Sequence, residues 1–400
     1  MVTAVMGTLA DPSLNPIGRM SAPTLRVLTF LYSFAPGGVE RVAARLHAAF
    51  VRHGVESRVV LANARIAPPF PLPAMTQVAP EPRGSTISRL LALVRGLPTI
   101  VARDRIDLLF CAGNTYTAPA VLLRLTMGRA CPPILAKISN DLVRPDMPWL
   151  VRLFYRRWLR IQGRYIDHFV GMAPAMRGEI ATLIGVPDDR ISVIEDPALS
   201  DADLARLARV RDAAQRDHAG RHFLAIGRLA PQKNFPLLLD AFARIVQPGD
   251  TLHILGEGPE RAALEAQAAR LGIVDSVALP GHTDPLDVWL GQADAFVLSS
   301  DFEGVPAVVI EALAAGLPIV ATDCCVSMAD LLGHGTLGSL VPVGDAAALS
   351  AAMDTVASTE PAEIVAARRA AAARFTIEHA TGRYIELMQR LVDQRYGARV

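Results

Sequence analysis

The side chains with the plainest chemistry in this 400-residue sequence are two glutamates eight positions apart, Glu303 and Glu311. We expect Glu303 in a loop and Glu311 five residues into a helix entered at Pro306, about 7.5 Å along its axis at about 1.5 Å per residue. Carboxylates so placed can bind two parts of one elongated ligand but are poorly placed to share one atom. The alternative is a solvated loop glutamate and an exposed helix glutamate.

Arg228 and Lys233 form a second candidate pair, between a predicted strand at 221–226 and a predicted helix that runs through Val246. On one strand-to-helix loop they can converge on a diphosphate, because arginine binds phosphate through two hydrogen bonds and lysine acts as a point charge. Only two of the forty basic residues are lysines, which suggests a specific task for Lys233; the alternative is a solvated loop.

The loop around Glu303 follows a predicted buried strand at 295–298 and leads into the helix at Pro306. Proline suits the first turn of a helix because its missing N–H would have no partner there. The loop therefore presents backbone N–H groups and the positive end of a helix dipole where open α/β sheets bind phosphorylated ligands. The ligand-binding positions expected in this loop are Phe302, Gly304, Val305 and Pro306.

A glycine pair, Gly37 and Gly38, indicates a similar turn near the start of the chain. It follows a predicted strand at 25–32 and precedes a predicted helix in which apolar residues recur at helical spacing from Val39. Paired glycines at such a turn let the backbone approach a phosphate closely, and they also suit an ordinary tight turn.

Strands and helices alternate through the rest of the first half. Further strands are predicted at 57–62, 107–111, 133–137 and 166–171, with a helix at 87–103 and a proline-rich loop at 67–82. This alternation predicts a doubly wound parallel sheet, and 400 residues exceed what one core usually organises. We therefore expect two α/β domains.

Charge and cysteine content restrict the class of protein. Residues 1–196 carry a net charge of +9 and residues 197–400 a net charge of −8, which suggests different partners for the two halves. The four cysteines lack metal-binding spacing, which favours reduced thiols in a cytoplasmic protein: Cys111, Cys131, Cys324 and Cys325. The sequence predicts neither a signal peptide nor a membrane span.

Residues 147–165 combine aromatic and basic side chains: Trp149, Phe154, Tyr155 and Trp158 with Arg152, Arg156, Arg157, Arg160 and Arg164. That composition suits a basic amphipathic helix lying on an anionic membrane. It suits equally a helix that packs its aromatics on the sheet and leaves its arginines in water. Both interpretations stay open.

The segment from Glu303 onward resembles the signature of family-four retaining glycosyltransferases of the GT-B fold. Seven residues separate Glu303 from Glu311, with Gly304 and Pro306 between them, followed by Ala312-Leu313-Ala314-Ala315-Gly316-Leu317-Pro318. The resemblance covers most of residues 25–395. It implies that Glu303 and the loop amides hold a donor sugar and that Glu311 binds the nucleotide ribose.

Other motifs extend the resemblance. Gly37 and Gly38, followed by Glu40, are similar to the family's glycine loop, which implies that they face the donor diphosphate. Arg228 and Lys233 are similar to its donor-phosphate motif. The loop at Gly281 and His282 is expected beside the nucleotide base, although His282 is equally an incidental polar residue.

The implied fold is α/β, with two Rossmann-like domains facing across a cleft. The expected divisions are a flexible N-terminal extension at 1–22, an acceptor-side domain at 23–197, a nucleotide-sugar domain at 198–375, and a helix at 376–400 that crosses back to the first domain.

Two stretches depart from the family's pattern. Many relatives carry a histidine after the strand corresponding to 107–111, whereas this sequence has none there. The candidates to serve instead are Asn114, or Lys137, Asn140 and Asp141 from the next loop. Residues 327–332 also replace a Gly-Gly-Pro and a glutamate that relatives often carry.

The resemblance implies sugar transfer from a UDP- or GDP-sugar to a hydroxyl of a glycan or lipid-linked acceptor, in assembly of a cell-surface polysaccharide. We expect Arg228, Lys233 and Glu303 to be catalytic, without a metal or cofactor, because fixed charges can stabilise the leaving diphosphate. The expected location is the cytoplasm or the inner face of the membrane, with no nucleic-acid partner. The alternatives are a sugar-nucleotide-binding subunit without catalysis and a non-hydrolysing sugar-nucleotide epimerase, against which the missing histidine argues.

Overall fold

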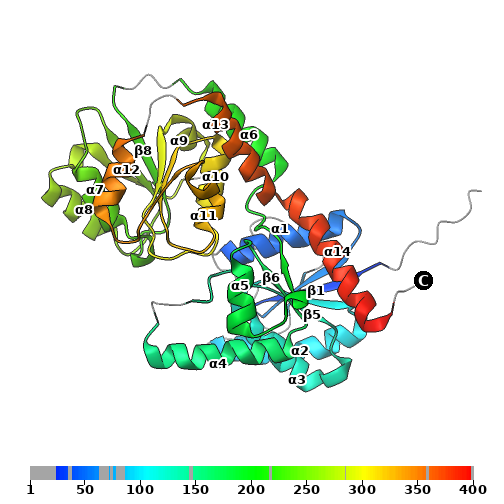
Figure 1. Ribbon diagram of the computed structural model, residues 1–400. Coiled ribbons are helices and arrows are strands. Elements are labelled where there is room, and N and C mark those ends of the chain that lie inside the picture. The colour runs from blue at the N-terminus through cyan, green and yellow to red at the C-terminus, as the bar shows by residue number, and fades with distance from the viewer. Residues whose placement is uncertain are drawn as a thin grey trace, which may run out of the picture.

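The computed structural model of the protein contains two parallel sheets, each covered by helices (Figure 1). The structure describes residues 24–34, 38–62, 72, 75–77, 86–143, 147–215, 219–283, 285–356 and 360–397. The predicted extension at 1–22 and the predicted phosphate-facing Gly37 lie outside the described residues.

The first sheet has seven parallel strands in the order β3-β2-β1-β4-β5-β6-β7. Its strands are β1 (Arg26–Leu31), β2 (Glu56–Leu61), β3 (Met75–Gln77), β4 (Leu108–Cys111), β5 (Ile134–Lys137), β6 (His168–Gly171) and β7 (Ile191–Val193). The predicted strands are found within about two residues of their expected bounds. The expectation of a loop throughout 67–82 is wrong at β3, because an edge strand pairs on one side only and tolerates neighbouring prolines.

Five helices of the described residues connect these strands: α1 (Gly38–Arg52), α2 (Thr86–Arg103), α3 (Thr117–Met127), α4 (Trp149–Tyr165) and α5 (Met176–Glu179). The spacing that predicted α1 places Val42, Leu46 and Phe50 in the core. The first turn of α1 therefore lies at the carboxyl end of β1, as the position of the glycine pair requires.

The second sheet has six parallel strands in the order β10-β9-β8-β11-β12-β13. These are β8 (His222–Ile226), β9 (Thr251–Leu255), β10 (Val277–Gly281), β11 (Ala295–Leu298), β12 (Ile319–Thr322) and β13 (Ser339–Val341). Phe223 and Ala225 lie in one hydrophobic cluster and Leu224 in another. Successive residues point to opposite faces, so both faces of this sheet are buried, as is usual for parallel sheets.

The remaining helices cover the second sheet or return to the first domain. They are α6 (Asp201–Ala213), α7 (Phe235–Ala243), α8 (Arg261–Leu271), α9 (Asp287–Gln292), α10 (Ala307–Ala315), α11 (Met328–Leu331), α12 (Ala346–Asp354), α13 (Ala362–Ala372) and α14 (Ile377–Tyr396). The helix expected to start at Pro306 starts one residue later, with Pro306 as its N-cap.

The chain passes between the two sheets twice, and the crossing segments pair with each other. Leu199, ahead of α6, forms a parallel bridge with Thr376, ahead of α14. Helix α14 then runs along the first domain (Figure 1), where the Tyr384 ring lies 5.5 Å from Phe110 and 6.3 Å from Phe50 between centroids. These contacts attach the end of the chain to the first core.

Candidate active site

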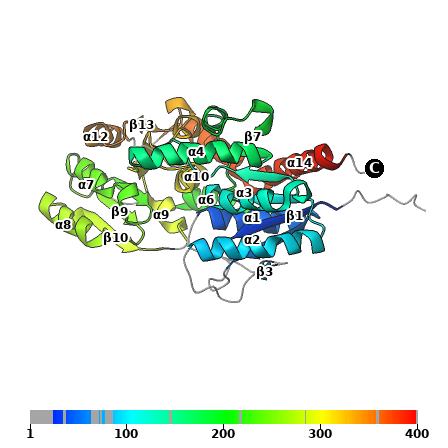
Figure 2. The same ribbon diagram turned by 90° about the horizontal axis from the view of Figure 1, so that it is seen from below.

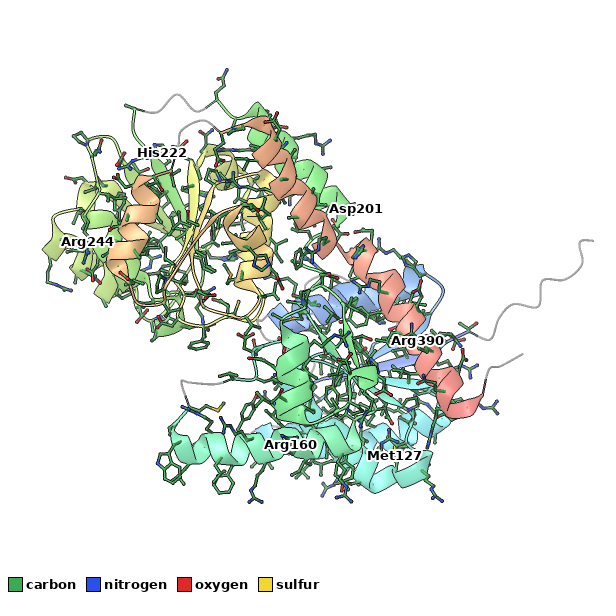
Figure 3. All side chains as sticks on the ribbon, in the orientation of Figure 1. Met127, Arg160, Asp201, His222, Arg244 and Arg390 are labelled. Carbon is green, nitrogen blue, oxygen red and sulfur yellow. The ribbon has the colours of Figure 1, made fainter. Side chains whose placement is uncertain are left out.

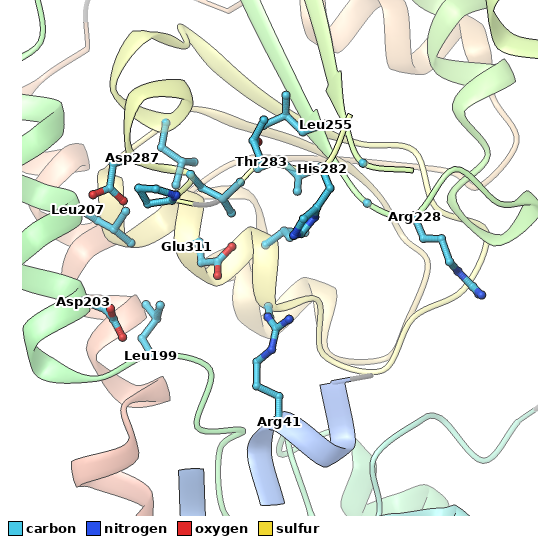
Figure 4. Close-up of a pocket in the computed structure, with 18 of the residues that line it drawn as sticks. Arg41, Leu199, Asp203, Leu207, Arg228, Leu255, His282, Thr283, Asp287 and Glu311 are labelled. Carbon is cyan, nitrogen blue, oxygen red and sulfur yellow. The ribbon is translucent and has the colours of Figure 1, made fainter. Parts of the chain in front are cut away.

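A cleft of about 690 Å³ lies where α1 of the first domain faces the second domain (Figure 4). The second domain lines it with the loops that follow β8, β9 and β10, with α6 and α9, and with the first half of α10. Of the residues predicted from the sequence, Arg228, His282 and Glu311 line this cleft. The carboxyl ends of parallel strands therefore form its floor, as open α/β sheets predict.

Backbone hydrogen bonds join the loops that follow β8, β9 and β10 into one wall of the cleft. The Gly227 N–H donates to Leu255 at 2.9 Å, and the Gly256 N–H donates to Gly281 at 2.8 Å. Gly256 has a φ of +140°, and a Cβ added there would lie 1.9 Å from the Gly227 carbonyl oxygen. Only glycine fits this approach, so the wall that carries Arg228 is fixed by the backbone itself.

Lys233 and Glu303 lie beside the cleft and bind each other. Lys233 Nζ is 2.7 Å from Glu303 Oε1, and the Ser300 hydroxyl donates to the same oxygen at 2.8 Å. The two side chains are 16% and 12% exposed. The lysine stem crosses Gly227, where an added Cβ would lie 2.8 Å from Lys233 Cε. The structure thus brings two predicted catalytic residues together and keeps the lysine charge next to the cleft wall.

The loops that carry this ion pair are held in register by further bonds. The Asp301 N–H donates to the Gln232 carbonyl at 2.9 Å, and Gln232 Nε2 donates to the Phe302 carbonyl at 2.9 Å. Asn234, with a φ of +44°, caps α7 and donates from Nδ2 to Asp301 at 2.7 Å. The carbonyl of Phe302 is therefore occupied by the protein's own side chain.

The loop after Glu303 touches the first domain. A Cβ added to Gly304 would lie 2.5 Å from the Ser139 carbonyl oxygen and 3.2 Å from Asn140 Oδ1. Asp141 Oδ2 accepts a 3.0 Å hydrogen bond from the Val326 N–H, and Val305 packs against both domain cores. The structure therefore brings Asn140 to the predicted donor-sugar loop but does not place it among the residues that line the cleft.

The residues expected to serve in place of the missing histidine lie in different environments. Asn114 Oδ1 accepts a 2.7 Å hydrogen bond from the Ser139 N–H and so holds two loops together. Lys137 is buried in an ion pair with Asp196, on the crossover between the domains. Lys137 therefore has a structural partner, and the structure does not place it among the residues that line the cleft. Asp141 keeps one buried oxygen, Oδ1, without a hydrogen-bond partner among the described residues.

Glu311 is the other predicted carboxylate, and it faces the cleft from α10 (Figure 4). Its Oε2 is buried and has no hydrogen-bond partner among the residues that the structure describes. Burial raises the pKa of Glu311 to about 7, against the opposing charges of Arg45 and Arg41. Arg228 is exposed and points away from Glu311 in Figure 4. The two side chains thus lie at different parts of the cleft.

Several cleft residues were not predicted from the sequence: Arg41, Arg45, Asp203, Arg206, Thr283 and Asp287. Arg206 forms ion pairs with both Asp203 and Asp287, which lie on different helices. That cluster gives no local sequence signal, because the fold assembles it. Arg41 and Arg45 did give one, since arginines four apart after the glycine pair lie on one helix face.

Comparison with known proteins agrees with this geometry. The model of Glycosyltransferase Family 4 matches residues 36–197, and the model of Glycosyl transferases group 1 matches residues 220–359. The exopolysaccharide phosphotransferase SCO2592 of Streptomyces coelicolor is 32% identical over 181 residues, 44% of this chain and 19% of that protein. The lipopolysaccharide core biosynthesis glycosyltransferase LpsE of Rhizobium meliloti is 30% identical over 168 residues, 41% of this chain and 48% of that protein. The chain spans at most about half the length of these curated relatives.

Solved structures confirm the predicted fold. Sucrose-phosphate synthase from Thermosynechococcus elongatus has a TM-score of 0.73 at 18% identity, covering 92% of this chain and 100% of that one. The Anabaena protein HepE, in complex with UDP and glucose, has a TM-score of 0.71 at 18% identity with the same coverage. Both support the predicted GT-B arrangement of two Rossmann-like domains. The two family models together span most of residues 36–359, and the chain therefore carries a Glycosyltransferase Family 4 domain followed by a Glycosyl transferases group 1 domain.

Proposed function

We propose that the protein is a retaining glycosyltransferase that needs no metal or cofactor and moves a sugar from a UDP- or GDP-sugar to a hydroxyl of a glycan or lipid-linked acceptor. The observation that carries this proposal is the interdomain cleft, with the Glu311 carboxylate on one side and Arg228 beside the Lys233–Glu303 pair on the other. This arrangement suits a ligand with hydroxyls at one part and phosphates at another.

Two comparisons support the donor and acceptor classes. The HepE structure contains UDP and glucose, which favours a uridine nucleotide, and LpsE is named for lipopolysaccharide core synthesis. The amylovoran biosynthesis glycosyltransferase AmsK of Erwinia amylovora is a further relative, 30% identical over 197 residues. We therefore propose assembly of a bacterial cell-surface polysaccharide as the role.

The proposed chemistry rests on electrostatic stabilisation of the leaving diphosphate. Arg228 and Lys233 supply positive charge as the glycosidic bond breaks. Ser300 also donates to Glu303, so this carboxylate keeps a partner when the lysine turns towards a phosphate. The acceptor hydroxyl attacks from the face that the diphosphate leaves, and the departing phosphate takes its proton. Retention then needs no side-chain nucleophile.

The direct test is donor turnover by the purified full-length protein. It is incubated with UDP-glucose, UDP-galactose, UDP-N-acetylglucosamine and GDP-mannose, with lipid-linked and glycan acceptors, in the presence and absence of a metal chelator. We expect acceptor-dependent release of the nucleoside diphosphate from one donor, unchanged by the chelator, and a product with the donor's anomeric configuration. Failure to bind or cleave any donor would contradict the proposal.

One observation favours a second candidate function, a sugar-nucleotide-binding subunit without catalysis. The position near the family's histidine is held by Asn114, whose side-chain oxygen is already bound to the Ser139 N–H. A single-turnover experiment with labelled donor and acceptor separates the two candidates. A binding subunit would retain intact donor, whereas an enzyme releases the diphosphate within that turnover.

We also propose that the first domain attaches to the inner, anionic face of the membrane through α4. This helix runs along the bottom of the first domain in Figure 1 and faces the viewer in Figure 2. The sequence left two interpretations of this helix open, and each of them fits some of its side chains. Tyr155 and Trp158 pack against the core, whereas Trp149 is 72% and Phe154 70% exposed. The exposed arginines of the same helix are Arg156, Arg157, Arg160 and Arg164.

Exposed aromatic rings among arginines suit an anionic lipid surface, because the rings enter the headgroup region and the guanidinium groups pair with lipid phosphates. Figure 3 shows Arg160 on α4, at the bottom of the first domain, and its Nη2 donates a 2.9 Å hydrogen bond to the carbonyl oxygen of Thr182. Within the part of the chain that the structure describes, no helix is both long and apolar enough to span a bilayer. The attachment that we propose through α4 is peripheral.

A further inference from the structure

Arg41 belongs to the first domain but lines the cleft that the second domain builds (Figure 4). The residue before it, Glu40, accepts a 2.7 Å hydrogen bond from the hydroxyl of buried Tyr116. This bond anchors the first turn of α1 to the element after β4. Arg41 is therefore presented to the cleft from a fixed turn, although its own side chain is exposed.

The two arginines of α1 that line the cleft differ in their partners. Arg45 donates to the carbonyl oxygen of Ala198, on the crossover between the domains. Arg41 has no hydrogen bond or ion pair to any residue that the structure describes. Arg45 thus has a structural task, whereas the guanidinium group of Arg41 is available for a ligand.

Glu311 faces Arg41 from the opposite wall of the cleft (Figure 4). Its buried Oε2 has no hydrogen-bond partner among the described residues. No ion pair joins Glu311 to Arg41 or Arg45 in the described structure, although both arginines act on the pKa of the carboxyl. A buried carboxylate oxygen without a partner is costly, so this position favours a ligand that donates a hydrogen bond.

The chemistry of the two walls restricts the ligand. It must donate a hydrogen bond to Glu311 and present an acceptor, preferably an anion, to Arg41 a short distance away. A ribose 5′-phosphate does both, because its hydroxyls donate and its phosphate accepts a bidentate guanidinium contact. The neighbouring Leu199, Leu207 and Leu290 line the same cleft and suit the apolar face of a base.

We infer that Arg41 binds the phosphate adjoining the ribose of the bound nucleotide, reaching it from the domain opposite to the one that holds Glu311 and Arg228. The inference rests on the proposed function and adds a residue to its donor site. Arg228, which points away from Glu311, then serves the second phosphate, next to Lys233. A nucleotide bound in this way is held by both domains at once.

The test is a set of binding titrations on the full-length protein with uridine, UMP and UDP, and with guanosine, GMP and GDP. In Arg41→Gln we expect the affinity for the monophosphate and the diphosphate of the preferred base to fall by about tenfold or more, with nucleoside affinity unchanged. Arg228→Gln is expected to weaken diphosphate binding far more than monophosphate binding. Arg41→Lys, which keeps the charge without the planar fork, is expected to lie between wild type and Arg41→Gln.

A matched control is Arg52→Gln, at the exposed far end of the same helix, which is expected to bind all six ligands as the wild type does. Unchanged monophosphate and diphosphate binding in Arg41→Gln would overturn the inference and leave the proposed function standing. An equal loss for uridine or guanosine would also overturn it, because Arg41 would then support the cleft rather than contact a phosphate. If the wild type binds no nucleoside diphosphate, the proposed function itself fails.

Discussion

Lys233 and Glu303 form an ion pair, with 2.7 Å between Nζ and Oε1, although 70 positions separate them in the sequence. Strands β8 and β11 are neighbours in the second sheet, so the loops that follow them meet at its carboxyl edge. The other lysine of the chain, Lys137, is likewise bound to a carboxylate, that of Asp196. Both lysines of this arginine-rich protein thus hold a fixed, partnered position.

The first prediction concerns the charges proposed to stabilise the leaving diphosphate. Lys233→Ala and Arg228→Ala are each expected to reduce turnover by about 10²–10³, the usual effect of removing one stabilising donor. Lys233→Ala also leaves Glu303 with Ser300 as its remaining partner. Steady-state rates of diphosphate release measure both effects, with Arg270→Ala, on the exposed side of α8, as the control. Near-normal rates in both variants would refute the proposed role.

The second prediction separates the two glutamates. Glu311→Gln is expected to weaken binding of free nucleoside diphosphate, because Glu311 lines the cleft with an unpartnered oxygen. Glu303→Gln is expected to leave that binding largely intact and to reduce sugar transfer, because Glu303 lies beside the cleft next to the first domain. Calorimetry with UDP and GDP, followed by transfer assays, measures the difference. Equal losses of affinity in both variants would rule out this division of roles.

The third prediction uses the contact between the domains at Gly304. An added Cβ would lie 2.5 Å from the Ser139 carbonyl oxygen, a backbone atom that cannot move alone. Gly304→Ala is therefore expected to push the two loops apart and to reduce turnover by about tenfold to a hundredfold, since a displacement near 1 Å suffices for that. Nucleotide binding is expected to change little, which calorimetry checks. Gly178→Ala is the control, because nothing lies within 4 Å of a Cβ added there.

The alternation of strands and helices could be predicted because each element carries its own periodicity. Residues such as Val42 and Leu46 in α1, or Phe223 in β8, are buried at the spacing of their element. The loop around Glu303 could be predicted for the same reason, since it follows a strand and precedes a helix within one short stretch of sequence. Local patterns thus located the second-domain loops of the site.

Contacts across the domains could not be predicted in this way. The hydrogen bond from the Val326 N–H to Asp141 joins residues 185 positions apart, and no local pattern specifies it. The same holds for Arg41, whose place opposite Glu311 depends on how the two domains sit together. The ion pair of Lys137 is of the same kind, because its partner, Asp196, lies on the crossover segment, which the sequence does not place next to β5.

The fourth prediction is a pH dependence at Asp141. Burial raises the pKa of Asp141 to about 7 from its usual 3.8, although the Val326 N–H bonded to Oδ2 opposes the rise and neighbouring Glu179 adds to it. Between about pH 4 and pH 7, the folded state therefore keeps a proton on this carboxyl, whereas the unfolded state has lost it. The stability contributed by this carboxyl falls as pH rises through that range and stays low above it.

Asp141→Asn removes this ionisation and keeps an oxygen for the Val326 N–H. Its melting temperature, relative to wild type, is expected to rise between about pH 4 and pH 7 and to level off above. Thermal unfolding at a series of pH values measures the difference. Asp275→Asn, at an exposed position, is expected to show no such trend. A difference between Asp141→Asn and wild type that is the same at every pH would show that the buried carboxyl does not titrate as described.

The last prediction concerns attachment through α4. Each basic residue near an anionic lipid surface contributes about 1 kcal/mol, an attraction that salt screens. We expect the protein to co-sediment with vesicles that contain phosphatidylglycerol at low salt and to release at high salt. Binding should be lost when Arg156, Arg157, Arg160 and Arg164 become Gln, and reduced when Trp149 and Phe154 become Ser.

The two sets of variants separate the charge of α4 from its apolar surface. Trp149 and Phe154 are exposed, so their replacement should leave the melting temperature unchanged while it weakens the salt-resistant part of binding. Arg244→Gln and Arg270→Gln, on the second domain away from α4, are the charge-matched controls, and Figure 3 shows Arg244 on the far side of the molecule from Arg160. If wild-type protein ignores anionic vesicles at every salt concentration, the arginines are only a solvated helix face, and an acceptor free in solution becomes the better hypothesis.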